Sequence, residues 1–129
     1  MLYLCATPIG NLGDVSHRLL EVFNMVDLIA CEDTRRTVQL LNYFDIHKQL
    51  TSYHEHNKMA SGERIVARLL AGESCALITD AGMPAISDPG EDLVKLCAEA
   101  GVTVSVVPGP SSVVSALALS ALSTRRFSF

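Results

Sequence analysis

Short runs of apolar residues alternate along the chain with longer segments in which apolar residues recur every three to four positions. The short runs are typical of strands buried in a parallel sheet, and the longer segments are typical of amphipathic helices. Strands are predicted at residues 2–6, 27–31, 50–53, 75–79 and 102–107, each followed by a helix. The helices are predicted at 16–26, 33–44, 57–71, 88–101 and 111–122. This alternation predicts an α/β fold, a doubly wound and mostly parallel five-stranded sheet with helices on both faces.

One domain of ordinary size accounts for most of the chain. Its 129 residues, 49% of them hydrophobic, are enough to bury a substantial core. The chain ends on the alternating pair Phe127 and Phe129, a pattern typical of the beginning of another strand. We therefore expect residues 1–122 to form an N-terminal α/β domain and residues 123–129 to begin a connection to a second, C-terminal domain.

Charge and cysteine usage narrow the functional classes. The formal net charge is −4, so RNA binding would need a local basic patch rather than the field of the whole protein. The longest apolar stretch, residues 113–122, is too short to span a membrane. The cysteines, at positions 5, 31, 75 and 97, lack the spacing of metal ligands and lie in apolar segments. This favours reduced, buried thiols in a cytoplasmic protein.

The most informative segment is the loop at residues 80–90, which follows a buried strand. It contains two glycines, two prolines and two aspartates. Asp88 is predicted to be the N-cap of the next helix, with Pro89 at the first helical position and Glu91 completing a capping box. A plain connection does not need so many residues, and Gly82 would let the backbone approach a ligand closely. Since open α/β sheets bind ligands at the carboxyl ends of their strands, we expect a binding site here.

Two further loops belong to the same predicted edge of the sheet. Residues 108–112 hold two prolines and a glycine ahead of Ser111 and Ser112, either of which could cap the last helix. The free backbone donors of that helix would then point to the edge that carries the loop at residues 80–90. The first loop, residues 7–14, has neither a three-glycine dinucleotide fingerprint nor the Gly-Lys-Ser/Thr of a P-loop.

Two adjacent arginines, Arg35 and Arg36, lie in the first turn of the second predicted helix. Positive charge there opposes the helix dipole, which a purely structural helix would avoid. The arginines could bind a polyanion such as the phosphates of RNA, or they could form a solvated face that pairs with Glu32 and Asp33. The sequence leaves both possibilities open.

His54 and His56 follow the third predicted strand and could share one face, as metal ligands do. No third ligand is evident nearby, and histidines at strand ends are frequently polar loop residues. We therefore expect no metal. A metal-dependent hydrolase built around these two histidines remains an alternative from a different functional class.

Five motifs, taken together and in order along the chain, resemble one known family. They are Ala-Thr-Pro-Ile-Gly-Asn-Leu-Gly-Asp (6–14), Cys-Glu-Asp-Thr-Arg-Arg-Thr (31–37), His-Glu-His-Asn (54–57), Asp-Ala-Gly-Met-Pro-Ala-Ile-Ser-Asp-Pro-Gly (80–90) and Val-Pro-Gly-Pro-Ser-Ser (107–112). The chain resembles the ribosomal RNA small subunit methyltransferase I family of the tetrapyrrole methylase superfamily. Each motif is weak alone, and the combination is specific.

The resemblance implies an S-adenosylmethionine-dependent methyltransferase that acts on the ribose 2′-hydroxyl of a cytidine in 16S rRNA of the small ribosomal subunit. It also implies a homodimer whose subunits have two domains with the cofactor between them. Because the chain matches only the first domain, we expect it to be inactive alone. A sister methyltransferase acting on a tetrapyrrole or a protein side chain is the alternative within the superfamily, and a scaffold module without a cofactor response is a third.

The same resemblance assigns residues to the cofactor site. They are Pro8, Asp80, Gly82, Met83, Ile86, Ser111 and Ser112. In the wider superfamily an acidic residue often occupies the position of Met83, so no carboxylate contact to the cofactor is assumed there. Arg35 and Arg36 are expected to contact rRNA phosphates.

Methylation of a ribose hydroxyl benefits from a group that accepts its proton. Glu32, Asp33 and His54 follow predicted strands and are the candidates on the correct edge of the sheet. The sequence does not choose among them.

Overall fold

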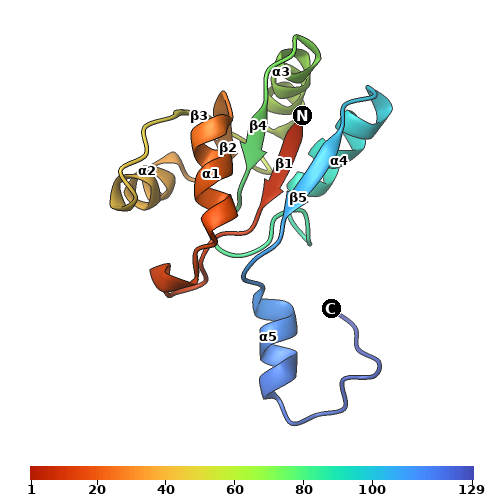
Figure 1. The fold of residues 1–129 in the computed structure, drawn as a ribbon. Helices are drawn as coiled ribbons and strands as arrows, with labels where there is room; N and C mark the ends of the chain where they lie inside the picture. The colour runs from red at the N-terminus through yellow and green to blue at the C-terminus, as the bar shows by residue number, and fades with distance from the viewer.

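The computed structural model describes all 129 residues (Figure 1). The strands are β1 (Leu2–Cys5), β2 (Leu28–Cys31), β3 (Gln49–Ser52), β4 (Cys75–Leu77) and β5 (Val104–Val107). The helices are α1 (His17–Met25), α2 (Thr34–Tyr43), α3 (Lys58–Leu70), α4 (Gly90–Glu99) and α5 (Ser112–Leu119), with a short 3-10 helix, η1 (Leu12–Asp14), after β1. The predicted alternation of strands and helices is confirmed.

The five strands form one parallel sheet in the order β3-β2-β4-β1-β5. All residues of β2 and of β4 are buried, which explains why both strands are continuous apolar runs. The predicted doubly wound α/β fold is therefore confirmed.

Two apolar clusters cover the two faces of the sheet. Ile29 and Cys31 of β2 pack in one cluster with α1 and α2. Phe23 of α1 is fully buried in this cluster. Leu28 and Ala30, the alternate residues of β2, pack in the other cluster with α3 and α4. Because successive side chains of a strand point to opposite faces, the same four-residue strand contributes to both layers.

Helix α5 departs from the expectation that every helix packs on the sheet. None of its residues is buried, and it lies beyond the carboxyl edge of the sheet with the C-terminal segment beside it (Figure 1). Its sequence, Ser-Val-Val-Ser-Ala-Leu-Ala-Leu, has no polar face opposite an apolar one, so nothing in it selects one side to turn toward the sheet. No helix of the structure is both long and apolar enough to cross a membrane.

The helix starts were predicted with mixed success. Ser16 and Asp33 are N-caps whose side chains accept hydrogen bonds from the first turns of α1 and α2. The predicted capping box at α4 is wrong, because Pro89 occupies the N-cap position and the helix begins at Gly90. Asp88 lies one residue earlier, and the Glu91 side chain lies 3.7 Å from the Lys95 ammonium.

Candidate functional site

The first loop and the loop at residues 80–90 are joined at the carboxyl edge of the sheet. Thr7 and Gly82 form an isolated antiparallel bridge, in which each backbone N–H donates to the other residue's carbonyl over 3.1 and 3.0 Å. The adjacent strands β1 and β4 lead to helices on opposite faces, α1 and α4. Such a divergence point is where doubly wound sheets bind ligands.

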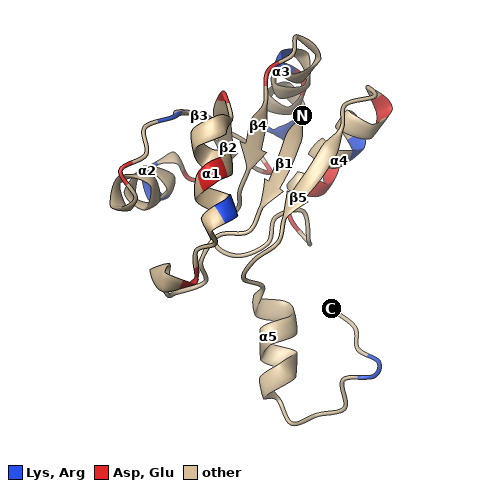
Figure 2. Ribbon diagram, in the orientation of Figure 1, with Lys and Arg blue, Asp and Glu red and all other residues tan.

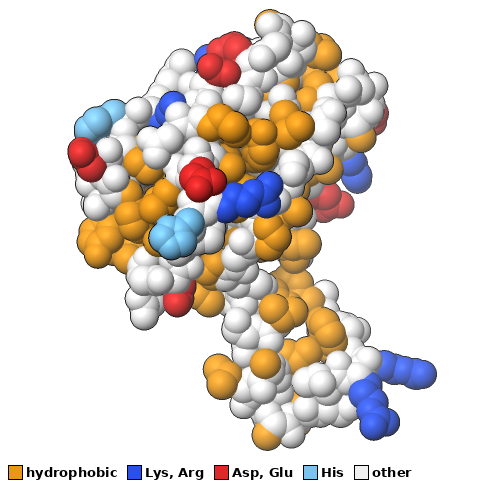
Figure 3. Space-filling model, viewed as in Figure 1, with side chains coloured by type: hydrophobic (Ala, Val, Ile, Leu, Met, Phe, Trp, Pro, Cys, Tyr) orange, Lys and Arg blue, Asp and Glu red, His pale blue; other side chains and the backbone are white.

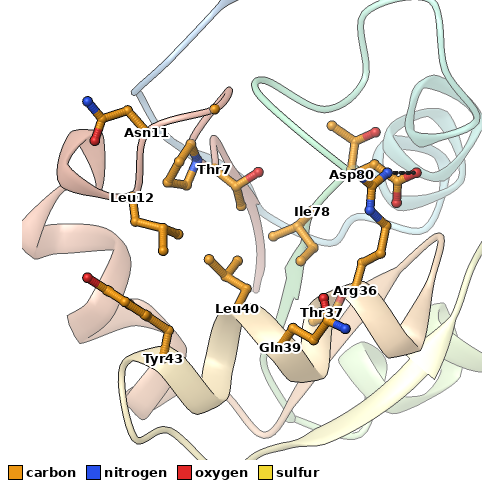
Figure 4. Close-up of a pocket in the computed structure, with 13 residues that line it drawn as sticks. Thr7, Asn11, Leu12, Arg36, Thr37, Gln39, Leu40, Tyr43, Ile78 and Asp80 are labelled. Carbon is orange, nitrogen blue, oxygen red and sulfur yellow. Dashed lines mark hydrogen bonds and ion pairs between the residues drawn. The ribbon is translucent and has the colours of Figure 1, made fainter.

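Two cavities open near this bridge. The α5-side cavity, of about 460 Å³, lies between the loop at residues 80–90 and the first turn of α5. The α2-side cavity, of about 380 Å³, lies between the first loop, α2 and the end of β4 (Figure 4). Thr79 lines both cavities and marks the place where they meet.

The structure divides the seven predicted cofactor residues between the two cavities. The α5-side cavity is lined by Gly82, Met83, Ile86, Ser111 and Ser112. Pro8 and Asp80 line the α2-side cavity instead. The predicted set is therefore brought to one edge of the sheet but not into one cavity.

The loop at residues 80–90 is held in an unusual backbone conformation. Ala85 and Ser87 have positive φ angles of 69° and 56°, which side chains other than glycine rarely adopt. The Asp88 carboxylate holds this conformation by accepting hydrogen bonds from the backbone N–H of Ala85 at 2.9 Å and of Gly90 at 2.8 Å. Strained backbone held by a buttressing group is characteristic of ligand-binding loops.

Gly82 brings three loops close together. Its φ is 82°, and a Cβ built on it would lie 3.2 Å from Cγ2 of Ile9 and 3.5 Å from the carbonyl oxygen of Pro110. A larger residue would strain the backbone and push the first loop and the residues 108–112 away from the loop that contains Gly82. The close approach of these three loops therefore depends on this glycine.

Asp33 and the two arginines have different surroundings. Oδ1 of Asp33 accepts hydrogen bonds from the backbone N–H of Arg35 at 2.9 Å and of Arg36 at 3.4 Å, so this carboxylate caps α2. The Arg36 guanidinium lies 3.5 Å from the Asp80 carboxylate and lines the α2-side cavity, whereas Arg35 is exposed and forms no ion pair. The solvated-face alternative predicted ion pairs with Glu32 and Asp33. Neither arginine forms such a pair.

Glu32 lines neither cavity itself but contacts the one residue that lines both. Its Oε1 accepts a hydrogen bond of 2.8 Å from the hydroxyl of Thr79, the residue common to both cavities. Glu32 is only partly buried, so its second carboxylate oxygen is free of protein partners. Of the three predicted proton acceptors, it is the one in direct contact with the wall of both cavities.

His54 lies away from both cavities. Its backbone N–H donates to the Asn57 side chain at 2.8 Å, and its ring Nδ1 accepts from the backbone N–H of His56 at 3.2 Å. The two imidazole rings are 6.0 Å apart. Nowhere in the structure do three side chains of His, Cys, Asp or Glu gather closely enough to hold a metal ion.

The cysteines are all free and buried. Burial raises the pKa of Cys5 and of Cys75 to about 12. Both thiols are therefore protonated at neutral pH, and neither can act as a nucleophile or as a proton acceptor in its present surroundings. The expectation of reduced, buried thiols agrees with this packing.

Charge is distributed unevenly between the body of the domain and the segment beyond the sheet. Charged residues cover the helices of the body, whereas α5 has none (Figure 2). After Glu99 the only charged residues are Arg125 and Arg126. The surface view shows apolar side chains gathered over α5 and the neighbouring segment (Figure 3).

The sequence did not point to most of the α2-side cavity. Leu12, Leu40 and Tyr43 line it from η1 and α2, and Thr7 lines it from the first loop. Leu40 and Tyr43 are three residues apart on α2, so they share one face of that helix. The one available signal was Thr7, a polar residue directly after an apolar strand.

A parallel sheet of this order, with two cavities at its carboxyl edge, defines the chain as an α/β ligand-binding domain. The family to which this domain belongs follows from its similarity to known proteins. The family model for tetrapyrrole (corrin/porphyrin) methylases matches residues 1–128, and the chain belongs to this family.

The chain is similar over its whole length to curated proteins named ribosomal RNA small subunit methyltransferase I. It is 50% identical over 129 residues to the protein of Synechocystis and 52% identical over 128 residues to that of Halalkalibacterium halodurans. It covers 46% and 44% of those two proteins, respectively. The chain thus spans about half the length of the curated relatives it matches.

Solved structures support the fold. A conserved hypothetical protein from Aeropyrum pernix matches 98% of the chain with a TM-score of 0.74 and 22% identity, over 44% of its own length. A uroporphyrin-III C-methyltransferase from Thermus thermophilus matches 92% of the chain with a TM-score of 0.67 and 21% identity, over 52% of its own length. At these identities the likeness concerns the fold alone.

Proposed function

We propose that this chain is the N-terminal half of an S-adenosylmethionine-dependent methyltransferase that methylates the ribose 2′-hydroxyl of a cytidine in 16S rRNA. The observation that carries the proposal is the convergence of Gly82, Met83, Ile86, Ser111 and Ser112 on one cavity at the carboxyl edge of the sheet. The names of the relatives that are about 50% identical supply the rRNA substrate.

The α5-side cavity fits the cofactor chemically. Its volume of about 460 Å³ lies within the usual range for small-molecule sites. Met83 and Ile86 offer apolar surface to an adenosine or methionine chain. Ser111 precedes α5 without a side-chain capping bond, so the first amides of that helix are available to a carboxylate.

S-adenosylmethionine supplies an electrophilic methyl group when it is bound. Much of the rate in such chemistry comes from holding the acceptor hydroxyl in line with that methyl group. Glu32 is our proposed proton acceptor, because its carboxylate accepts a hydrogen bond from Thr79, the residue that lines both cavities. Asp33 is occupied in capping α2, and the hydrogen bonds of His54 go to Asn57 and His56, neither of which lines a cavity.

Arg35 and Arg36 are proposed to bind rRNA phosphates. Both are exposed at the carboxyl edge, and Arg35 forms no ion pair that RNA would have to break. The Arg36–Asp80 pair is long and largely exposed, so it contributes little stability and leaves the guanidinium free to turn toward a phosphate.

The remainder of the site is proposed to come from the additional chain that the relatives possess. We infer a second domain, joined after residue 122, that closes the α5-side cavity, and a homodimeric, cytoplasmic enzyme that needs no metal. The exposed α5 and the open α5-side cavity support this division. Since no three metal-ligating side chains gather around His54 and His56, the hydrolase alternative has no structural support.

The test is methyl transfer by the protein extended to the length of its relatives. Small ribosomal subunits lacking the modification and tritiated S-adenosylmethionine should give stoichiometric labelling of 16S rRNA. Nuclease digestion should place the label in a 2′-O-methylcytidine. Label on a base, or on a protein of the subunit, would contradict the proposed acceptor.

A further inference from the structure

We propose that the α2-side cavity binds a single nucleotide of the RNA, with its base inside the cavity and its phosphate at Arg36. This inference rests on the proposed function, because it names the place of the acceptor nucleotide. The sequence assigned Arg36 to RNA phosphates and Asp80 to the cofactor, but it gave no ligand to Thr7, Leu12, Leu40 or Tyr43, which line the same cavity. The cavity is a separate space from the α5-side cavity, with Thr79 as their common wall residue.

The cavity has the size and the apolar walls that a nucleobase needs. Its volume of about 380 Å³ is at the small end of ligand sites. Leu12 and Leu40 face one another across it, and Ile78 closes the end near β4 (Figure 4). Tyr43 lies at the mouth with two thirds of its surface exposed, held edge-on against Phe44 at 4.9 Å. An exposed aromatic ring beside apolar walls suits the stacking of an unpaired base.

A buried hydroxyl in the cavity wall has no partner. Thr7 is 1% exposed, and its Oγ1 is the one buried side-chain polar atom of the structure without a hydrogen bond. In Figure 4 the hydroxyl points to the side of the cavity where Ile78 and Asp80 lie. Buried polar atoms of native proteins are nearly always satisfied, so this hydroxyl indicates a missing polar group. A base edge or ribose hydroxyl can both donate to it and accept from it.

The charges around the cavity suit one phosphate rather than several. Arg36 and Asp80 are its only charged lining residues. One guanidinium can hold one phosphate, and the nearby carboxylate repels a polyphosphate chain. Asp80 can also accept a hydrogen bond from an exocyclic amine or a ribose hydroxyl. This balance fits a nucleotide within a chain and disfavours a nucleoside triphosphate.

The position of the α2-side cavity next to the α5-side cavity also supports this proposal. Thr79, whose hydroxyl donates to Glu32, stands between the nucleotide proposed here and the proposed cofactor cavity. A base inside the α2-side cavity would leave its ribose near this residue. Enzymes that modify one nucleotide commonly extract it from its neighbours into such a pocket.

The test is a titration with cytidine 5′-monophosphate, monitored by NMR. The protein used is extended to the length of its relatives. Saturable shifts of residues around the cavity are expected, and inorganic phosphate should bind at least tenfold more weakly. Leu40→Trp fills the cavity and should weaken nucleotide binding by at least tenfold. Val38→Trp adds the same side chain to an exposed site on the same helix, outside the cavity lining, and should change the affinity less than twofold.

Thr7→Val provides a second variant that keeps the shape of the side chain. It should weaken nucleotide binding by about three- to tenfold, the effect of one lost hydrogen bond, with an unchanged melting temperature. Absence of saturable nucleotide binding, or equal affinity in wild type and both cavity variants, would overturn the proposal. Retained nucleotide binding in a protein that transfers no methyl group would contradict the proposed function and leave this site standing.

Discussion

The two cavities at the carboxyl edge are built from walls of different kinds. The α2-side cavity lies against α2 and the ends of β1 and β4, and its wall includes the buried residues Thr37 and Ile78. The α5-side cavity is bounded by a strained loop and by a helix without one buried residue. Ile86, in its wall, is 56% exposed. The packed core therefore supports part of the wall of the first cavity, whereas the second is bounded mainly by a loop and by an exposed helix.

This difference supports a division of the two proposed ligands between this chain and the second domain that we propose. The proposed nucleotide cavity takes part of its wall from the packed core of this chain, so we expect its binding to depend mainly on these residues. The cofactor cavity offers only part of the contacts, and a ligand must overcome its lost freedom before any affinity is measured. The predictions below separate these two cases.

The largest effect is expected from the 129-residue chain on its own. It should transfer no detectable methyl group to small ribosomal subunits and should bind S-adenosylmethionine at most weakly, because half a cleft cannot place the hydroxyl in line with the methyl group. The measurement is a tritiated-methyl assay in which this chain is compared with a protein extended to the length of its relatives. Comparable incorporation by the short chain would show that the whole catalytic machinery lies within these residues.

The next largest effect concerns the cofactor wall. Ile86→Asp should weaken S-adenosylmethionine binding by on the order of 100-fold in the longer protein, because a carboxylate would lie against apolar cofactor surface. Cooperative unfolding should persist, since Ile86 is mostly exposed. Leu70→Asp, at a similarly exposed apolar position on α3, is the matched control and should leave cofactor affinity unchanged. Equal calorimetric affinity of Ile86→Asp and wild type would remove Ile86 from the site.

Glu32→Gln should slow methyl transfer by about 100-fold while cofactor and RNA affinities stay the same, because only the acceptance of the ribose proton is lost. The amide oxygen can still accept the hydrogen bond from Thr79, so the local structure should persist. Asp33→Asn keeps a capping oxygen for α2 and should change the rate less than threefold. Single-turnover kinetics measure both rates, and a larger loss in Asp33→Asn would exchange the two assignments.

The smallest effect is expected on the affinity for RNA. Replacing Arg35 and Arg36 by alanine should weaken binding by on the order of tenfold and reduce the slope of log affinity against log salt by about 1.4, as two single-strand phosphate contacts are lost. Cofactor affinity should not change. Arg64→Ala, on the exposed surface of α3, controls for a general loss of positive charge. An unaltered slope in the double variant would show that these arginines contact no RNA phosphate and only form a solvated surface.

The two helix caps near the site differ in how well the sequence predicted them. The sequence offered Asp33 or Thr34 as the cap of α2, and the structure has Asp33 there, through side-chain hydrogen bonds that reach only two or three residues. The predicted cap at Asp88 was wrong, because Pro89 occupies the N-cap position and the Asp88 carboxylate divides its hydrogen bonds between the amides of Ala85 and Gly90. Which amide such a carboxylate serves depends on the folding of the loop around it.

The sequence by itself determined the sheet, the division of its apolar residues into two layers and the edge at which the loops gather. Periodicity of two or of about 3.6 residues suffices for this, since it assigns each side chain to a face before any long-range contact forms. Only the tertiary structure decided that the predicted site is two cavities and that Thr79 joins them. It also decided that Thr7 is buried without a partner and that α5 leaves the sheet. These features depend on distances between loops far apart in the chain, which packing sets and periodicity does not encode.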